Sequence, residues 1–233
     1  MKLFFTLFLI LVLAPLQSFA AVDGYTTIRY RTQTIYISDS GVKEHKKEME
    51  AWLEFLKKKI LLIQQLKLSK TIQKRLVKIP IFVEWNLWDA AAMYHPNKTW
   101  LVENGYPPAK EKSVEVTNIT NFVDRTRLNQ PYMLLHEFAH AYMDLYLTKK
   151  EKDNIWATYR RAVREWHYDS VEYTPGGDMV KVMKKAYALT NEQEYFAETT
   201  EAYLWINDFY PYNREDLKKH DPYGYKLMES IWK

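Results

Sequence analysis

Two histidines four residues apart are the first residues in this chain that could do chemistry. Residues 131–147 read PYMLLHEFAHAYMDLYL, an almost wholly apolar run that is longer than a typical strand and predicts a buried helix. Side chains at i and i+4 project from one face of a helix, so His136 and His140 would lie side by side. Two such imidazoles can bind one tetrahedral zinc ion, with Glu137 beside the metal to handle a proton.

The alternative is two ordinary histidines on a helix. The pattern His-Glu-x-x-His should arise by chance in about one chain in a hundred of this length. Burying two imidazoles and a carboxylate without partners would also cost roughly 1–3 kcal/mol per group. A bound metal ion removes much of that cost, and the sequence therefore favours a metal site.

A second stretch, residues 186–206, places three carboxylates on one face of a predicted helix. Glu194, Glu198 and Glu201 stand at i, i+4 and i+7 among aromatic residues. A solvated acidic face is the ordinary interpretation of such a pattern. A zinc ion held by two histidines, however, needs a third protein ligand, and the chain has no cysteine. A carboxylate is the natural candidate for that ligand, leaving the fourth position to water.

The remaining pattern indicates a small sheet followed by helices. We expect a strand or hairpin at 25–38, a long amphipathic helix at 44–68, strands at 79–85 and 113–118, a helix at 150–166, a turn-rich loop at 169–178 and a final helix at 223–232. Thr190 and Gln193 fit a capping box, which predicts a helix start between them. The strand at 113–118 is either an edge strand that could pair with a peptide or an ordinary strand of the sheet.

Composition limits the classes of function. The 233 residues are 47% hydrophobic, which indicates a globular protein, and the net charge is only +4. No basic stripe with interleaved aromatic residues is visible, so nucleic acid is an unfavourable partner. The absence of cysteine excludes disulfides, thiolate zinc sites and a cysteine nucleophile.

Residues 1–20 have the features of a signal peptide. Lys2 supplies the positive charge, residues 3–13 form a short apolar run, and Ser18 and Ala20 provide small residues before a cleavage site. We expect a mature chain that starts near Ala21, is secreted or periplasmic, and has no membrane span after cleavage. An uncleaved anchor is the alternative. Residues 21–233 show no composition shift and are expected to form a single domain.

The two motifs together resemble a known family. His-Glu-Phe-Ala-His at 136–140, followed by Asn-Glu-x-Glu-Tyr-Phe-Ala-Glu at 191–198, is similar to the gluzincin zinc metallopeptidases of the anthrax lethal factor and Pro-Pro endopeptidase group. The resemblance covers residues 131–205, about a third of the chain. It implies a zincin-like metallopeptidase domain within an α+β fold, with a small N-terminal sheet and a mostly helical C-terminal half.

The resemblance also implies roles for individual residues. It makes Glu194 the third zinc ligand beside His136 and His140, and it places Glu198 behind the ligands as a support. Tyr187 stands seven residues before Glu194, where the family has a tyrosine that helps to stabilise the transition state. A packed aromatic residue is the alternative for Tyr187.

The expected function is that of a secreted, zinc-dependent metallopeptidase that hydrolyses peptide bonds. One Zn²⁺ per chain would activate water, Glu137 would act as general base, and the partner would be a peptide or protein substrate. The alternative is a catalytically silent zinc-binding domain that acts as a binding or scaffold protein, against which the intact Glu137 argues. His167 lies between the two motifs and is a candidate for substrate binding or an ordinary surface or packed histidine. The sequence does not indicate an oligomeric state.

Overall fold

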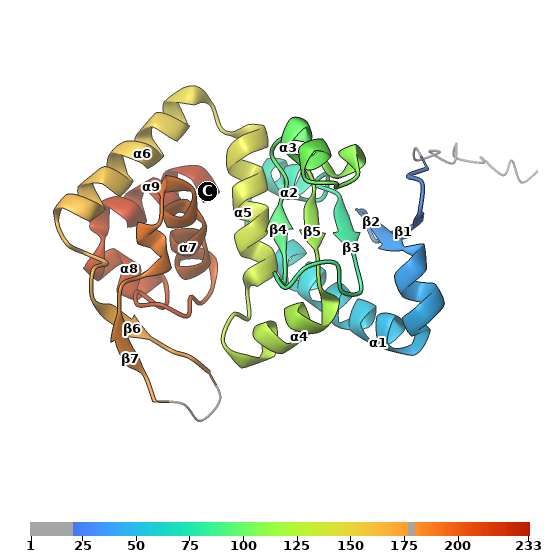
Figure 1. Ribbon diagram of the computed structural model, residues 1–233. Helices are drawn as coiled ribbons and strands as arrows, with labels where there is room; N and C mark the ends of the chain where they lie inside the picture. Colours follow the sequence, from blue (N-terminus) through green and yellow to red (C-terminus); the bar gives the residue numbers. More distant parts are fainter. Residues whose placement is uncertain (1–20, 177–179) are drawn as a thin grey trace, which may run out of the picture.

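The computed structural model describes residues 21–176 and 180–233, so the predicted signal peptide lies outside the described residues. Helix α5 (Met133–Tyr146) lies between two groups of elements (Figure 1). The sheet and its helices precede α5 in sequence and lie on one side of it, and a mostly helical group that follows lies on the other. The fold is therefore α+β, with the small N-terminal sheet and helical C-terminal half that the sequence predicts.

The sheet has five strands in the order β1-β2-β3-β5-β4. They are β1 (Tyr25–Tyr30), β2 (Gln33–Ser38), β3 (Ile81–Val83), β4 (Met93–Tyr94) and β5 (Val114–Val116). The first two form an antiparallel hairpin, which confirms the prediction for residues 25–38. β2, β3 and β5 run parallel, and β4 pairs antiparallel with β5 at the edge.

The strand predicted at 113–118 is an inner strand. β5 pairs with β3 on one side and β4 on the other, so the edge-strand alternative for this segment is wrong. The edge beside α5 is instead β4, which lies between the strands predicted at 79–85 and 113–118 and is not itself predicted (Figure 1). A strand of two residues is too short to show the alternation by which strands are recognised.

Four helices and one short 3-10 helix accompany the sheet. They are α1 (Asp39–Gln64), α2 (Lys70–Leu76), α3 (Lys98–Glu103), η1 (Pro108–Lys110) and α4 (Ile119–Leu128). The Ser38 side chain accepts a hydrogen bond from the Gly41 N–H and caps α1. Met49, Leu56 and Ile60 form its buried stripe, which confirms a long amphipathic helix that begins earlier than predicted.

Helix α5 is packed on both sides. Leu135, Phe138 and Ala139 are almost fully buried. Tyr142, near the end of the helix, links the two groups of elements. Its hydroxyl accepts a hydrogen bond from Arg75 of α2 at 3.1 Å, and its ring lies 4.7 Å from that of Trp232 near the C-terminus. The helix that carries the two histidines is thus held in place from both sides.

The C-terminal group comprises helices and one ribbon. It contains α6 (Lys149–Arg164), β6 (Val171–Tyr173), β7 (Val182–Lys184), the 3-10 helix η2 (Tyr187–Leu189), α7 (Glu192–Leu204), α8 (Arg214–His220) and α9 (Pro222–Trp232). The helices predicted at 150–166 and 223–232 are confirmed. The loop predicted at 169–178 is only partly confirmed, because β6 lies within it and pairs antiparallel with β7. Residues 177 and 178 of the predicted loop lie outside the described residues. In the described ranges, no helix has both the length and the apolar character needed to cross a membrane.

Candidate metal centre

The two histidines of α5 share one face of the helix. His136 and His140 are one turn apart, and their rings meet edge to face with centroids 4.7 Å apart. Their side chains are only 12% and 14% exposed. The apolar residues of α5 occupy the other faces and pack into the core, so the two imidazoles are left on the face that meets α7.

Helix α7 presents Glu194 to these histidines. The helix begins one residue later than the predicted capping box would place it, because Thr190 ends the preceding 3-10 helix η2 and Asn191 is the N-cap. The Asn191 side chain accepts a hydrogen bond of 2.8 Å from the backbone N–H of Glu194. The cap therefore fixes the backbone of the residue whose carboxylate reaches the histidines.

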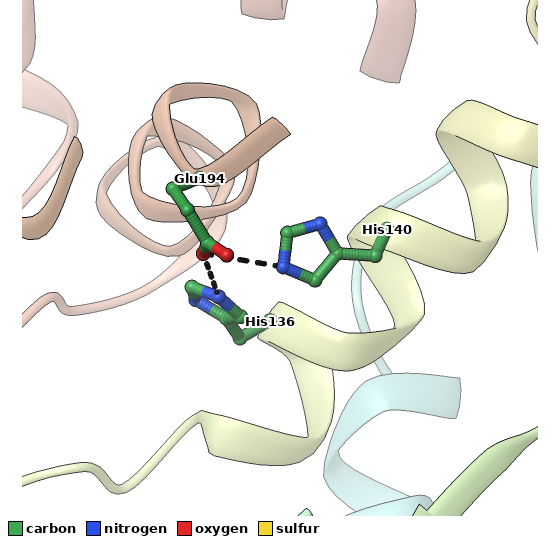
Figure 2. Close-up of side chains that lie close together, drawn as sticks. All are labelled: His136, His140 and Glu194. Atoms are coloured by element: carbon green, nitrogen blue, oxygen red, sulfur yellow. Dashed lines mark hydrogen bonds and ion pairs between the residues drawn. The ribbon is translucent and has the colours of Figure 1, made fainter. Parts of the chain in front are cut away.

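Three donor atoms converge between the two helices. Glu194 Oε2 lies 2.9 Å from His136 Nε2 and 3.3 Å from His140 Nε2. Figure 2 shows the Glu194 carboxylate facing both imidazoles. A tetrahedral zinc ion with ligand bonds of about 2.0–2.1 Å separates its ligand atoms by about 3.3 Å. The spacing and chemistry of the three donors therefore fit a zinc ion, and this group could hold a metal.

The carboxylate of Glu194 and the imidazole of His136 stabilise each other's charged forms. Burial alone would raise the pKa of Glu194, but hydrogen bonds from His136 and His140 lower it to about 2. Burial would likewise lower the pKa of His136, but its contacts with Glu194 and Glu201 raise it well above its usual value. Without a metal ion, the site thus holds its carboxylate ionised and stabilises positive charge on His136.

The structure places two further carboxylates of α7 behind His136. Glu201 Oε1 is 2.7 Å from His136 Nδ1, whereas Glu198 Oε1 is 3.7 Å from the same atom. The other Glu198 oxygen accepts a hydrogen bond of 3.0 Å from Asn207 Nδ2. Sequence reasoning gave Glu201 no individual role. The available signal was its place seven residues after Glu194, on the same helical face.

Buried acids surround this arrangement. The pKa of Glu198 is raised well above its usual value by burial and by the negative charges of Glu201 and Asp208. Burial and the charge of Glu201 also raise the pKa of Asp208 to about 7. These shifts favour the protonated, neutral forms of Glu198 and Asp208 on this side of the site.

A cavity of about 1090 Å³ opens beside the three donor atoms. Its lining includes Glu137, Tyr187 and both residues of the edge strand β4. Glu137 is partly buried, and its carboxylate forms no hydrogen bond within the part of the chain that the structure describes. Tyr187 is 48% exposed, with its ring centroid 6.3 Å from that of His136. The arrangement brings a metal-binding group, a carboxylate and a phenol to one cavity.

His167 lies elsewhere. Its Nε2 is 3.2 Å from Glu165, and its ring packs 5.5 Å from that of His220. It is not among the described residues that line the cavity. The structure therefore gives His167 the environment of an ordinary packed histidine, and the suggestion that it contacts substrate is not supported.

Comparison with known proteins gives one distant match. No protein-family model matches the sequence, and no curated protein matches it. Among solved structures, the Pro-Pro endopeptidase PPEP-2 from Paenibacillus alvei is similar over 78% of this chain and 90% of its own, with 18% identity and a TM-score of 0.44. Similarity at this level does not establish a shared activity, so function must be inferred from the geometry of the site.

Proposed function

We propose that residues 21–233 form one zincin-like domain that hydrolyses peptide bonds with one bound zinc ion. The observation that supports this most strongly is the convergence of His136, His140 and Glu194 on the wall of a cavity that also contains Glu137. A structural metal site is normally closed by four protein ligands. Three protein donors beside an open cavity are typical of a catalytic site.

His136, His140 and Glu194 would hold the metal, since two imidazoles and a carboxylate without sulfur are a ligand set that suits zinc. When bound, zinc would lower the pKa of a coordinated water to about 7 and polarise the carbonyl of the scissile bond. The protein contributes a rigid arrangement of the ligands, because α5 and α7 are both largely buried.

Glu137 is the general base in this proposal. Glu137 lines the cavity and directly follows the ligand His136 in sequence. It would accept a proton from the attacking water at a carboxylate oxygen and return that proton to the leaving nitrogen. The carbon–nitrogen bond then breaks to give a carboxylate and an amine, with one water consumed.

Tyr187 is proposed to bind the oxygen of the scissile carbonyl. Burial raises the pKa of its phenol, and the negative charge of Glu194 raises it further. The hydroxyl therefore keeps its proton at neutral pH and can donate a hydrogen bond to the oxygen as negative charge develops there. Its ring is partly exposed and lines the same cavity as the proposed zinc ligands.

The proposal includes export. A signal peptide at residues 1–20 would deliver the mature chain outside the cytoplasm, as a secreted or periplasmic enzyme acting on peptides or proteins.

The test is metal content together with peptide cleavage, measured on residues 21–233. Wild type should contain one zinc per chain and cleave members of a peptide library, and a chelator should abolish cleavage. Glu194→Ala should lose the zinc, whereas Glu137→Gln should keep the zinc and lose cleavage. Glu192→Gln is the matched control, because Glu192 is on the same helix and, among the described residues, its carboxylate accepts a hydrogen bond only from the neighbouring Gln193 side chain.

The outcomes separate the two candidate functions. Zinc in the wild type without cleavage of any peptide would favour the zinc-binding scaffold over the peptidase. If the wild type binds no zinc, even after zinc is added, both the peptidase and the zinc-binding scaffold are excluded.

A further inference from the structure

The His136 imidazole lies between two carboxylates of α7. Its Nε2 is 2.9 Å from Glu194 Oε2, and its Nδ1 is 2.7 Å from Glu201 Oε1. Residues seven apart lie on one face of a helix, about 10 Å from each other along its axis. We propose that Glu201 is the positioning residue for His136, an inference that rests on the proposed zinc site. It would hold the ring so that Nε2 faces the metal.

The chemistry of the two nitrogens supports this role. A neutral imidazole has one N–H and one lone pair, whereas an ionised carboxylate only accepts hydrogen bonds. Nδ1 therefore donates its proton to Glu201, and the lone pair of Nε2 remains for a metal. Without this acceptor the ring could adopt the other tautomer or rotate, and Nε2 would then be a poorer ligand.

Because Glu201 is buried, its carboxylate and not water is the acceptor for His136 Nδ1. Glu201 is only 5% exposed, so water cannot easily replace its oxygen as the acceptor for Nδ1. Glu201 also lies on α7, the same helix that supplies Glu194. One rigid element therefore sets both the ligand on one side of the ring and the acceptor on the other.

Glu198 is less suited to the same task. Its nearer oxygen is 3.7 Å from His136 Nδ1, beyond hydrogen-bond distance. Its second oxygen is engaged by Asn207, which follows the end of α7. Glu198 lies beside the ring, but the geometry assigns the directional contact to Glu201.

Zinc affinity tests the inference without any assay of cleavage. Residues 21–233 would be titrated with zinc in competition with a chromophoric chelator of known affinity. Glu201→Ala should weaken zinc binding by about 10–100-fold, the usual effect of removing a carboxylate that orients a histidine ligand. Glu201→Gln keeps an oxygen that can accept from Nδ1 and should recover part of the loss. Glu192→Ala removes a carboxylate from the same helix away from the ring and should bind zinc like the wild type.

A second measurement separates positioning from folding. The increase in melting temperature that saturating zinc produces would be compared in wild type and Glu201→Ala. This difference depends on binding to the folded state, so a general loss of stability in the variant largely cancels. A smaller zinc-induced increase in Glu201→Ala, again partly restored in Glu201→Gln, is the expected result.

Two results would overturn the inference. Equal zinc affinity in wild type and Glu201→Ala would show that Glu201 does not position His136, while the proposed zinc site would stand. A larger loss in Glu198→Gln than in Glu201→Ala would transfer the role to Glu198. A wild type that binds no zinc is a different outcome, since it removes the proposed function and this inference together.

Discussion

The hydroxyl of Tyr94 donates a hydrogen bond of 2.6 Å to the carboxylate of Asp144. Tyr94 belongs to the edge strand β4, and Asp144 lies on α5 one turn beyond His140. Lys112, just before β5, donates to the same carboxylate oxygen at 2.7 Å. Asp144 thus ties the edge of the sheet to the helix that carries the candidate metal ligands, and it fixes one wall of the cavity relative to the other.

Loss of this contact should loosen the cavity wall. Tyr94→Phe removes the hydrogen bond to Asp144 but keeps the ring, and a hydrogen bond to a charged group is worth about 1.5–3 kcal/mol. We expect a decrease of about 1–2 kcal/mol in the free energy of unfolding, measured with urea, because Lys112 still engages the carboxylate. If the protein cleaves peptides as proposed, KM should rise while zinc affinity is unchanged.

The matched control for that variant is Tyr36→Phe, which removes a hydroxyl from the inner strand β2. A KM that rises equally in both variants, or does not change in Tyr94→Phe, would contradict a specific role for the contact between β4 and α5.

Asp144 should also make stability depend on pH. Burial disfavours its charged form, but hydrogen bonds from Lys112 and Tyr94 outweigh burial and hold the pKa of the carboxyl below its usual value. A lowered pKa in the folded state contributes stability above the pKa of the unfolded chain, about 3.9. That contribution is lost as pH falls through the folded value. The difference in unfolding free energy between wild type and Asp144→Asn should therefore shrink below about pH 4. An equal difference at pH 6 and pH 3 would count against this assignment.

The main helices and the N-terminal hairpin of β1 and β2 follow from local patterns, and for that reason the sequence predicts them. The stripe of Met49, Leu56 and Ile60 marks α1 because helical periodicity is visible within a single segment. The edge strand β4 has no comparable pattern in its own sequence. Its two residues form a strand only because β5, about twenty residues later, supplies the partner. Pairing between distant segments is not encoded in either segment alone.

In the candidate site, too, some residues can be grouped from local spacing, whereas other contacts depend on how distant segments pack. His136, Glu137 and His140 share one helical turn, so their grouping can be inferred from spacing alone. The approach of Glu194 depends on how α7 crosses α5, and the resemblance to a family, not the spacing, singled it out among three carboxylates. The 2.7 Å contact of Glu201 with His136 depends on that same crossing. A sequence places Glu198 and Glu201 on one face but does not tell which of them reaches the ring.

Asn191 should affect zinc binding because it caps the N-terminus of α7. Its side chain caps α7 by accepting from the Glu194 N–H, and loss of such a cap costs about 0.5–2 kcal/mol. Asn191→Ala should lower the unfolding free energy by that amount and weaken zinc binding, because the first turn of α7 carries the third ligand. Calorimetric titration with zinc would measure the second effect.

Asn213→Ala is the matched control for the cap, because Asn213 caps α8 in the same manner, accepting from the backbone of Glu215 and Asp216. It should cost similar stability and leave zinc affinity unchanged. Equal effects of both variants on zinc affinity would mean that the loss is a general consequence of destabilisation.

The last prediction concerns a group of buried charged residues on the sheet. Lys110 and Glu115 are fully buried and form an ion pair, and Lys110 Nζ also donates to Glu84 at 2.7 Å. Tyr25 of β1 donates to Glu84, and His95 contacts Glu115. The cation of Lys110 thus offsets Glu84, which follows β3, and Glu115, which lies within β5. These two inner strands pair with each other, and β5 also pairs with the edge strand β4.

Lys110→Met preserves most of the side-chain volume but leaves these carboxylates without their cation. Breaking a buried ion pair by removing one partner costs about 3–5 kcal/mol, because the remaining charge stays desolvated. We expect a loss of that size in the unfolding free energy, measured with urea, and a partial recovery when Glu115→Gln is added. Lys149→Met is the control, since the ion pair of Lys149 with Asp153 is exposed and such pairs contribute about 0–1 kcal/mol. If Lys110→Met costs no more than Lys149→Met, the buried charges do not hold the sheet together, and apolar packing alone must fix the strand beside the cavity.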